Sequence, residues 1–300
     1  MKYYLRKATV LILLLAGLHP IFSGRDIDPD DYFENTAVRR YIDRYTASDF
    51  REWLESCFGR GSFYKEYIID RIREYDLPEA LFFLPVVESG YNPKAISPSG
   101  ASGMWQFMMN SIEPYDLRVD EWIDERKDFW KSTSASLKKL QYNESILGDW
   151  LLAIAAYNCG LGRMQQAITE GGSRDFWTLA DGGYLPVETS RYVPKFLAIA
   201  YIGQNLADYN LPELDLPVWK WRRLPIKGQV NLQLLAAAAK IPEAILNLGN
   251  AELRYPVTPP EGYSYFLKVP DIYTDAINST LKGDITGLNR FYVHSIRPGD

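Results

Sequence analysis

Apolar residues recur three and four positions apart through the first two thirds of the chain, and this helical spacing constrains the fold more than any other feature. The spacing is clearest from about Asp30 to Tyr75. Nothing before Asp208 alternates between apolar and polar residues as a half-buried strand does, so this part is predicted to be all-α. The other helices predicted here are one that ends near Glu88 and those over Lys131–Tyr142, Asp149–Ala156 and Arg191–Leu206, the last with Pro194 in its first turn.

The character of the sequence then changes. Short strands are predicted at Leu224–Ile226 and Tyr265–Val269, and they flank two helical stretches over 232–240 and 241–248. This β-α-α-β order suits a small separate module, so the fold class expected is α+β, with a mainly α domain followed by a small βααβ module. The division expected is a leader over 1–24, a helical lead over 25–75, the α domain over 76–208, a linker over 209–223, the module over 224–270 and a second linker over 271–290.

The N-terminus has the pattern of a secretory leader. Three cations precede the apolar stretch Ala8–Leu18, namely Lys2, Arg6 and Lys7. That stretch holds about eleven residues, too few to span a membrane, and cleavage is expected near Ser23 or Gly24. No Cys follows, so a lipoprotein anchor has no attachment residue. The expected location is the periplasm or cell envelope, with peripheral contact with an outer membrane left open.

Charge and composition exclude several classes of function. The formal charge is −5, and loss of the three leader cations would move it to about −8, which argues against nucleic acid as a partner. With two histidines, one of them in the leader, a His-based metal site or a Ser-His triad is not expected. Neither a metal nor another cofactor is therefore predicted. Cys57 and Cys159 are either one disulfide or two free thiols.

Glu88 is the candidate for acid chemistry. It ends the apolar run Leu81–Val87 and is followed at once by a turn that contains Gly90 and Pro93. Apolar surroundings and the negative end of a helix dipole both raise the pKa of a carboxyl group, as a general acid requires. The alternative is a solvated glutamate at a helix end. The segment Asp76–Glu79 is predicted to cap the helix that leads to Glu88.

Four short motifs accompany this glutamate, in the order Glu88-Ser89-Gly90-Tyr91, Gly103-Met104-Trp105-Gln106, Ala156-Tyr157-Asn158-Cys159-Gly160 and Glu188-Thr189-Ser190-Arg191-Tyr192-Val193-Pro194. Each alone is weak, but together they resemble the lysozyme-like lytic transglycosylases, most closely the membrane-bound lytic murein transglycosylase D group. The stretch Trp122–Arg126 resembles the same group, and the resemblance covers roughly residues 35 to 270.

The resemblance implies a lysozyme-like catalytic domain that acts on peptidoglycan glycan strands as a monomer. Such enzymes cleave the β-1,4 bond between N-acetylmuramic acid and N-acetylglucosamine and leave a 1,6-anhydromuramyl end. Glu88 would act first as acid and then as base. A glycosidase that uses water ordinarily needs a second carboxylate, and Glu113, Asp116 and Asp120 remain candidates for it. The alternatives are a hydrolytic muramidase of goose-lysozyme type and a non-catalytic scaffold that binds the cell wall.

The resemblance also implies substrate contacts for seven residues, Ser89, Gly103, Met104, Gln106, Tyr157, Asn158 and Tyr192. Asn158 would hold the acetamido group of the sugar, and Tyr192 would reach Glu88 or the sugar. Several have a structural alternative: a hydroxyl that satisfies backbone at Ser89 and Tyr157, an amide that ties its own loop at Gln106, or a place in the core at Met104 and Tyr192.

The C-terminal part resembles peptidoglycan-binding LysM units. Residues 224–270 are similar to a diverged LysM unit, with a purely structural role as the alternative. Residues 291–300 resemble the opening strand and turn of a LysM repeat, so we expect a longer protein that continues beyond Asp300.

Overall fold

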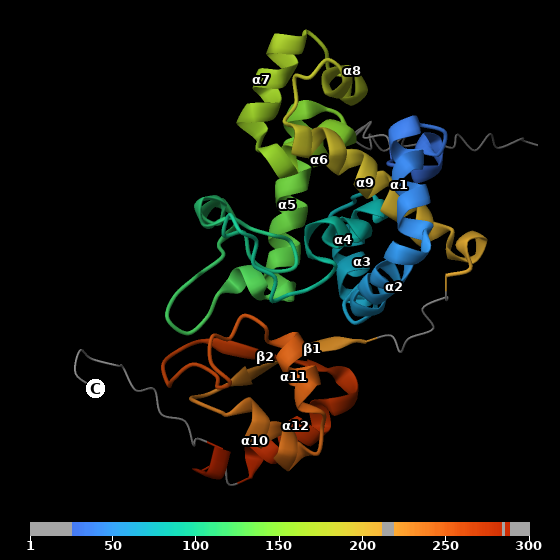
Figure 1. Ribbon diagram of the computed structural model, residues 1–300. Helices are drawn as coiled ribbons and strands as arrows, with labels where there is room; N and C mark the ends of the chain where they lie inside the picture. The colour runs from blue at the N-terminus through green and yellow to red at the C-terminus, as the bar shows by residue number, and fades with distance from the viewer. Residues whose placement is uncertain (1–25, 212–218, 284–285, 289–300) are drawn as a thin grey trace, which may run out of the picture.

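The computed structural model describes residues 26–211, 219–283 and 286–288, so the expected leader and the LysM-like start at 291–300 lie outside the described residues. Two parts are seen, a helical body and, beneath it in the view of Figure 1, a small module that contains the only sheet of the described residues. The α+β fold class is confirmed. Among the described residues, no helix combines the length and apolar character that a membrane span requires.

Three helices form the N-terminal side of the body. They are α1 Thr36–Thr46, α2 Ser48–Ser62 and α3 Lys65–Glu74, preceded by the short 3-10 helix η1 Pro29–Tyr32. The side chain of Asn35 accepts from the backbone N–H groups of Ala37 and Val38 and thereby starts α1. The apolar face of α1, with Val38 and Ile42 buried, packs against α9 (Figure 1).

The chain reaches Glu88 through a 3-10 helix, η2 Glu79–Phe83, and a short α-helix, α4 Leu84–Ser89. The cap predicted over Asp76–Glu79 is wrong, because Asp76 adopts φ 54° just after α3 and no side chain caps η2. The end of this helix at a glycine was predicted correctly. Gly90, at φ 60°, ends α4 in a left-handed conformation that glycine adopts without strain.

A long loop with three 3-10 turns leads from α4 to the remaining helices. The turns are η3 Met109–Ser111, η4 Glu113–Tyr115 and η5 Glu125–Lys127. The helices are α5 Phe129–Leu147, α6 Trp150–Cys159, α7 Leu161–Gly171, α8 Phe176–Asp181 and α9 Val187–Gln204, followed by η6 Leu206–Tyr209. Because α9 begins earlier than predicted, Pro194 lies inside it rather than in its first turn.

The module is built on two antiparallel strands, β1 Trp221–Ile226 and β2 Tyr265–Pro270, with Trp221 opposite Pro270. Between them lie α10 Leu232–Ala239 and α11 Glu243–Gly249. After β2 come η7 Asp271–Tyr273, α12 Thr274–Lys282 and η8 Thr286–Leu288. The predicted linker over 271–290 is therefore wrong where it meets α12, because Ile277 is fully buried and that helix packs on α10. The first predicted linker, over 209–223, also extends too far, because β1 already starts at Trp221.

The module is held to the body by backbone and aromatic contacts. The indole N–H of Trp221 donates to the carbonyl of Phe63 at 2.6 Å, and the hydroxyl of Tyr64 donates to the carbonyl of Leu248 at 3.2 Å. The ring of Phe129, the first residue of α5, contacts those of Tyr64 and Trp221, with centroids at 4.9 and 5.1 Å. The seam therefore combines hydrogen bonds with packed aromatic rings.

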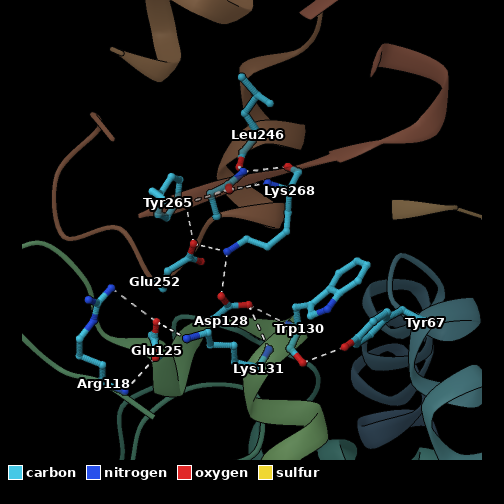
Figure 2. Close-up of polar contacts among 11 residues, drawn as sticks. Tyr67, Arg118, Glu125, Asp128, Trp130, Lys131, Leu246, Glu252, Tyr265 and Lys268 are labelled. Atoms are coloured by element: carbon cyan, nitrogen blue, oxygen red, sulfur yellow. Dashed lines mark hydrogen bonds and ion pairs between the residues drawn. The ribbon is translucent and has the colours of Figure 1, made fainter. Parts of the chain in front are cut away.

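A buried ionic group crosses the same seam. The Lys268 ammonium lies 2.8 Å from Asp128 of the body and also contacts Glu252 of the module (Figure 2). The side chains are 3%, 8% and 1% exposed in that order. Tyr265 donates its hydroxyl to Glu252 at 2.6 Å. Burial of such a group is costly unless its charges are paired, so these contacts fix how the two parts meet.

Candidate active site

Glu88 sits in the last turn of α4, where that helix packs against α9. Its side chain is partly buried, and the hydroxyl of Tyr192 on α9 donates to its carboxylate. The apolar run that precedes Glu88 anchors the short helix, since Leu84 and Val86 are buried in the body. The structure thus brings together the first and the fourth of the sequence motifs.

The surroundings of Glu88 raise its pKa to about 7. Burial is the largest cause because it disfavours the charged carboxylate, and the charge of Glu188 acts in the same direction. The hydrogen bond from Tyr192 and the charge of Lys139 act against it. A carboxyl group with a pKa near neutrality can donate a proton and later accept one, as acid and base catalysis in two steps requires.

Lys139 is a charged neighbour of Glu88 that sequence reasoning missed. Its ammonium lies 4.3 Å from the ring centroid of Tyr157 and donates to the Tyr157 carbonyl at 3.4 Å. Burial lowers the pKa of Lys139, and the charge of Glu88 partly offsets this. A signal was present, since Lys139 falls three residues after Ser136 and four before Asn143, both buried on the same face of α5.

The second motif forms a tight loop that is joined to Glu88 through its neighbour. Ser89 donates its hydroxyl to the Met104 carbonyl at 2.8 Å, and the Gln106 amide donates to the Gly103 carbonyl at 2.7 Å. The Met104 side chain is fully buried. Ser89 and Gln106 thus make the backbone contacts named as their structural alternatives, and any sugar contact of Met104 would come from its backbone.

Gly103 holds this loop against the segment before α5. It adopts φ 86°, and a Cβ added there would lie 1.8 Å from the carbonyl oxygen of Arg126. Arg126 is itself buried, donates to Asp124 through two nitrogens, and reaches the Gly100 and Phe107 carbonyls at 3.0 and 3.3 Å. Arg126 therefore supports the loop, a function that sequence reasoning did not assign to it.

Tyr157 and Asn158 end α6 beneath this loop. The buried hydroxyl of Tyr157 donates to the Trp105 carbonyl at 2.8 Å, so Tyr157 holds the loop from below. Asn158 is partly exposed, and its side-chain oxygen accepts from Thr189 at 2.7 Å. With that oxygen occupied, the amide N–H group has no acceptor among the described residues, and it can donate to a carbonyl such as that of an acetamido group.

The acids that follow the second motif do not act on Glu88. Asp120 accepts from the backbone N–H of Trp122 at 2.8 Å and from the Tyr263 hydroxyl of the module, and Glu113 and Asp116 are exposed. The carboxylate whose charge does reach Glu88 is the exposed Glu188 in the first turn of α9.

In the part of the chain that the structure describes, no group of three or more His, Cys, Asp or Glu side chains could hold a metal ion. Both cysteines are free thiols.

The class of domain can now be stated. Residues 66–180 match the family model described as Transglycosylase SLT domain, a range that includes Glu88 and Asn158 and ends before Tyr192. The resemblance predicted from the motifs is confirmed by this match and by the first of the relatives that follow.

Membrane-bound lytic murein transglycosylase D of Escherichia coli (strain K12) is 33% identical over 286 residues, which cover 89% of this chain and 61% of that protein. The chain thus spans less than two thirds of the length of this relative. A putative tributyltin chloride resistance protein of Alteromonas sp. (strain M-1) is 36% identical over 118 residues, covering 39% of this chain and 56% of that protein. The solved 70 kDa soluble lytic transglycosylase of Escherichia coli has a TM-score of 0.44 at 20% identity, covering 63% of this chain and 32% of that one.

Proposed function

We propose that this protein is a peptidoglycan lytic transglycosylase that cleaves the β-1,4 bond between N-acetylmuramic acid and N-acetylglucosamine. The single observation that carries the proposal is Glu88, a partly buried carboxyl group with a pKa raised to about 7 that accepts a hydrogen bond from Tyr192. The relative from Escherichia coli (strain K12) whose name describes a lytic murein transglycosylase supports the same activity.

The reaction needs one carboxyl group. Glu88 protonates the glycosidic oxygen as the bond from that oxygen to C1 of the muramyl residue breaks. The carboxylate then takes the proton from the C6 hydroxyl of the same sugar, whose oxygen closes onto C1. The product is a 1,6-anhydro end, and Glu88 regains its proton, so the steps balance without water.

The neighbours of Glu88 stabilise its side chain at the stage of the reaction when it is a charged carboxylate. Once Glu88 has given up its proton, the Tyr192 hydroxyl and the Lys139 ammonium stabilise the carboxylate, because both favour its charged form. The amide N–H group of Asn158 would hold the acetamido oxygen of the substrate and so place that group beside C1. Ser89, Gly103, Met104 and Gln106 would shape the loop that the glycan strand meets.

The remaining assignments concern where the protein works. We propose that it acts on glycan strands in the periplasm or cell envelope, as a monomer, and that residues 224–270 contribute a LysM-like contact with the wall. The packed seam supports a module that sits at a fixed position beside the catalytic domain.

The test is mass spectrometry of the fragments released from purified sacculi by the protein and by its Glu88→Gln variant. Glutamine keeps the size and the hydrogen-bonding ability of the side chain but has no proton to give. We expect products lighter by about 18 Da, the mass of one water, than those of a hydrolase, and no release by the variant. Reducing ends instead of anhydro ends would overturn the proposal in favour of a muramidase, with Glu188 as the acid to examine.

A further inference from the structure

A cavity lies in the seam between the body and the module, away from Glu88 and its partners. Its volume is about 310 Å³, and both parts of the chain line it. The body contributes the start of α5, with Trp130 and Lys131, and the module contributes residues of β1 and β2, among them Arg223 and Phe266. Figure 2 shows several of the polar side chains that surround it.

Glu252 has a buried oxygen that the fold leaves without a partner. One oxygen, Oε1, accepts from Tyr265 and Lys268, but Oε2 is buried and has no hydrogen-bond partner among the described residues. A buried acceptor left unpaired costs about 1–3 kcal/mol, so a native structure rarely keeps one without a reason. Glu252 lines the cavity, so a donor group that binds there and displaces the side chains covering this oxygen can satisfy it.

Arg223 is the cation of this cavity that has no carboxylate partner. Its guanidinium lies 4.4 Å from the ring centroid of Phe266 and 5.8 Å from that of Trp130, and it is in no ion pair of the described residues. The other three cations that line the cavity are paired, since Lys131 and Arg118 lie 2.7 and 3.8 Å from Glu125 and Lys268 lies 2.8 Å from Asp128. Arg223 is exposed, and its guanidinium is suited to bind a carboxylate through two parallel hydrogen bonds.

We propose that this cavity binds the zwitterionic end of an α-amino acid, with its ammonium at Glu252 Oε2 and its carboxylate at Arg223. If the chain is the peptidoglycan enzyme proposed above, the matching ligand is the free end of a diamino acid in the peptide part of the wall. The cavity would then hold a stem peptide beside the glycan strand, and the assignment of the ligand to the wall rests on that proposed function.

The experiment is isothermal titration calorimetry with three probes that share the same five-carbon segment. They are meso-diaminopimelate, pimelate, which lacks the amines, and cadaverine, which lacks the carboxylates. We expect meso-diaminopimelate to bind at least about tenfold more tightly than either of the others, because pimelate leaves Glu252 Oε2 without a donor and cadaverine leaves Arg223 without a carboxylate. Equal binding of pimelate would mean a simple anion site and would overturn the proposal, as would no binding of meso-diaminopimelate.

Two neighbouring arginines provide the matched variants. Arg223→Gln should weaken binding of meso-diaminopimelate at least about tenfold. Arg222→Gln should leave it unchanged, because Arg222 does not line this cavity and pairs with Asp271 at 2.7 Å. Equal binding by all three proteins would contradict the site. If thermal denaturation shows that the Glu252→Gln variant is folded, it should lose the preference for meso-diaminopimelate over pimelate.

The outcome is independent of the wall-cleaving activity. The titration is repeated in the Glu88→Gln variant, where binding should persist although cleavage is lost. If sacculi yield no anhydro ends while meso-diaminopimelate binds, the proposed function fails and the amino-acid site stands. If sacculi are cleaved and the probe does not bind, the reverse holds.

Discussion

At the scale of single residues, the acid at the centre of the site is defined by its neighbours more than by its position in the sequence. An apolar run ahead of Glu88 predicts partial burial, and burial is the main cause of its raised pKa. Tyr192 and Lys139 come from helices far along the chain and act in the opposite direction. The pKa near 7 is the balance of these effects, so each neighbour offers a way to move it.

Glu88→Gln should stabilise the protein at alkaline pH. The folded-state pKa of about 7 lies above the ordinary value of 4.5, so Glu88 favours the folded state most below about pH 4.5, and this contribution is lost as the pH rises through 7. The variant should gain on the order of 1–3 kcal/mol at pH 8 and much less at pH 5. Urea denaturation of both proteins at the two pH values measures this, and an equal difference at both would contradict the raised pKa.

Lys139→Met should move the alkaline limb of the pH profile of cleavage upward by about half a pH unit to one unit. The ammonium of Lys139 lowers the pKa of Glu88, so its removal leaves Glu88 protonated to higher pH. The profile of kcat/KM against pH on soluble glycan fragments gives the shift. Lys138→Met is the control, since Lys138 is exposed on the same helix, and its profile should match that of the unaltered protein.

At the scale of elements, the periodic helices were predictable and the turns between them were not. Helix α6 follows from the apolar run Trp150–Tyr157 and the glycine break at Gly160, and the strands of the module lie close to where the sequence places them. The cap before η2 was wrong because the left-handed conformation of Asp76 depends on how α3 meets the next turn. The pattern did contain Lys139 on the buried face of α5, but spacing alone does not tell a partly buried lysine from a solvated one.

Contacts across the seam were beyond sequence reasoning for a different reason. Asp128 and Lys268 lie 140 residues apart in the chain, and no local spacing relates them. The arrangement of the second motif had the same difficulty, because the close approach of Gly103 to Arg126 becomes visible only in three dimensions. Gly103 and Arg126 both lie in stretches that resemble the family, but the sequence pattern does not indicate that they are in contact.

The loop of the second motif gives a test with a matched control. Gly103→Ala should destabilise the protein by about 2–4 kcal/mol and reduce cleavage, because its Cβ would meet the Arg126 carbonyl and displace the loop that Ser89 holds. Gly100→Ala has a similar φ of 87° but open space around the added Cβ, so it should cost only about 1 kcal/mol. Thermal denaturation compares the two, and equal losses would mean that backbone strain alone is responsible.

At the scale of the whole molecule, the body and the module form a single structural unit. Buried aromatic rings, backbone hydrogen bonds and the ionic group around Lys268 all cross the seam. A module tied down in this way differs from a wall-binding domain on a flexible tether, since its distance from Glu88 is fixed. We therefore expect one cooperative unfolding transition for the described parts of the chain.

The Lys268→Met variant tests how much the buried ionic group stabilises the body and the module as one unit. Removal of Lys268 leaves the carboxylates of Asp128 and Glu252 buried without their shared cation, which should cost about 3–5 kcal/mol. Lys220→Met is the comparison, because Lys220 is 61% exposed and 3.5 Å from Glu66, a surface pair worth about 1 kcal/mol or less. Urea denaturation provides both values, and a loss of under about 1 kcal/mol for Lys268→Met would show that the ionic group is not important for stability.

Trp221 also provides an intrinsic fluorescent probe of the seam. Its indole is buried, stacked near Tyr64 and bonded through its N–H to the Phe63 carbonyl, an environment shielded from water. If the module separates from the body, this ring becomes hydrated and its fluorescence should shift to longer wavelength. The part of the shift that disappears in Trp221→Phe would belong to the seam, so an intrinsic chromophore can follow the opening of the protein without any added label.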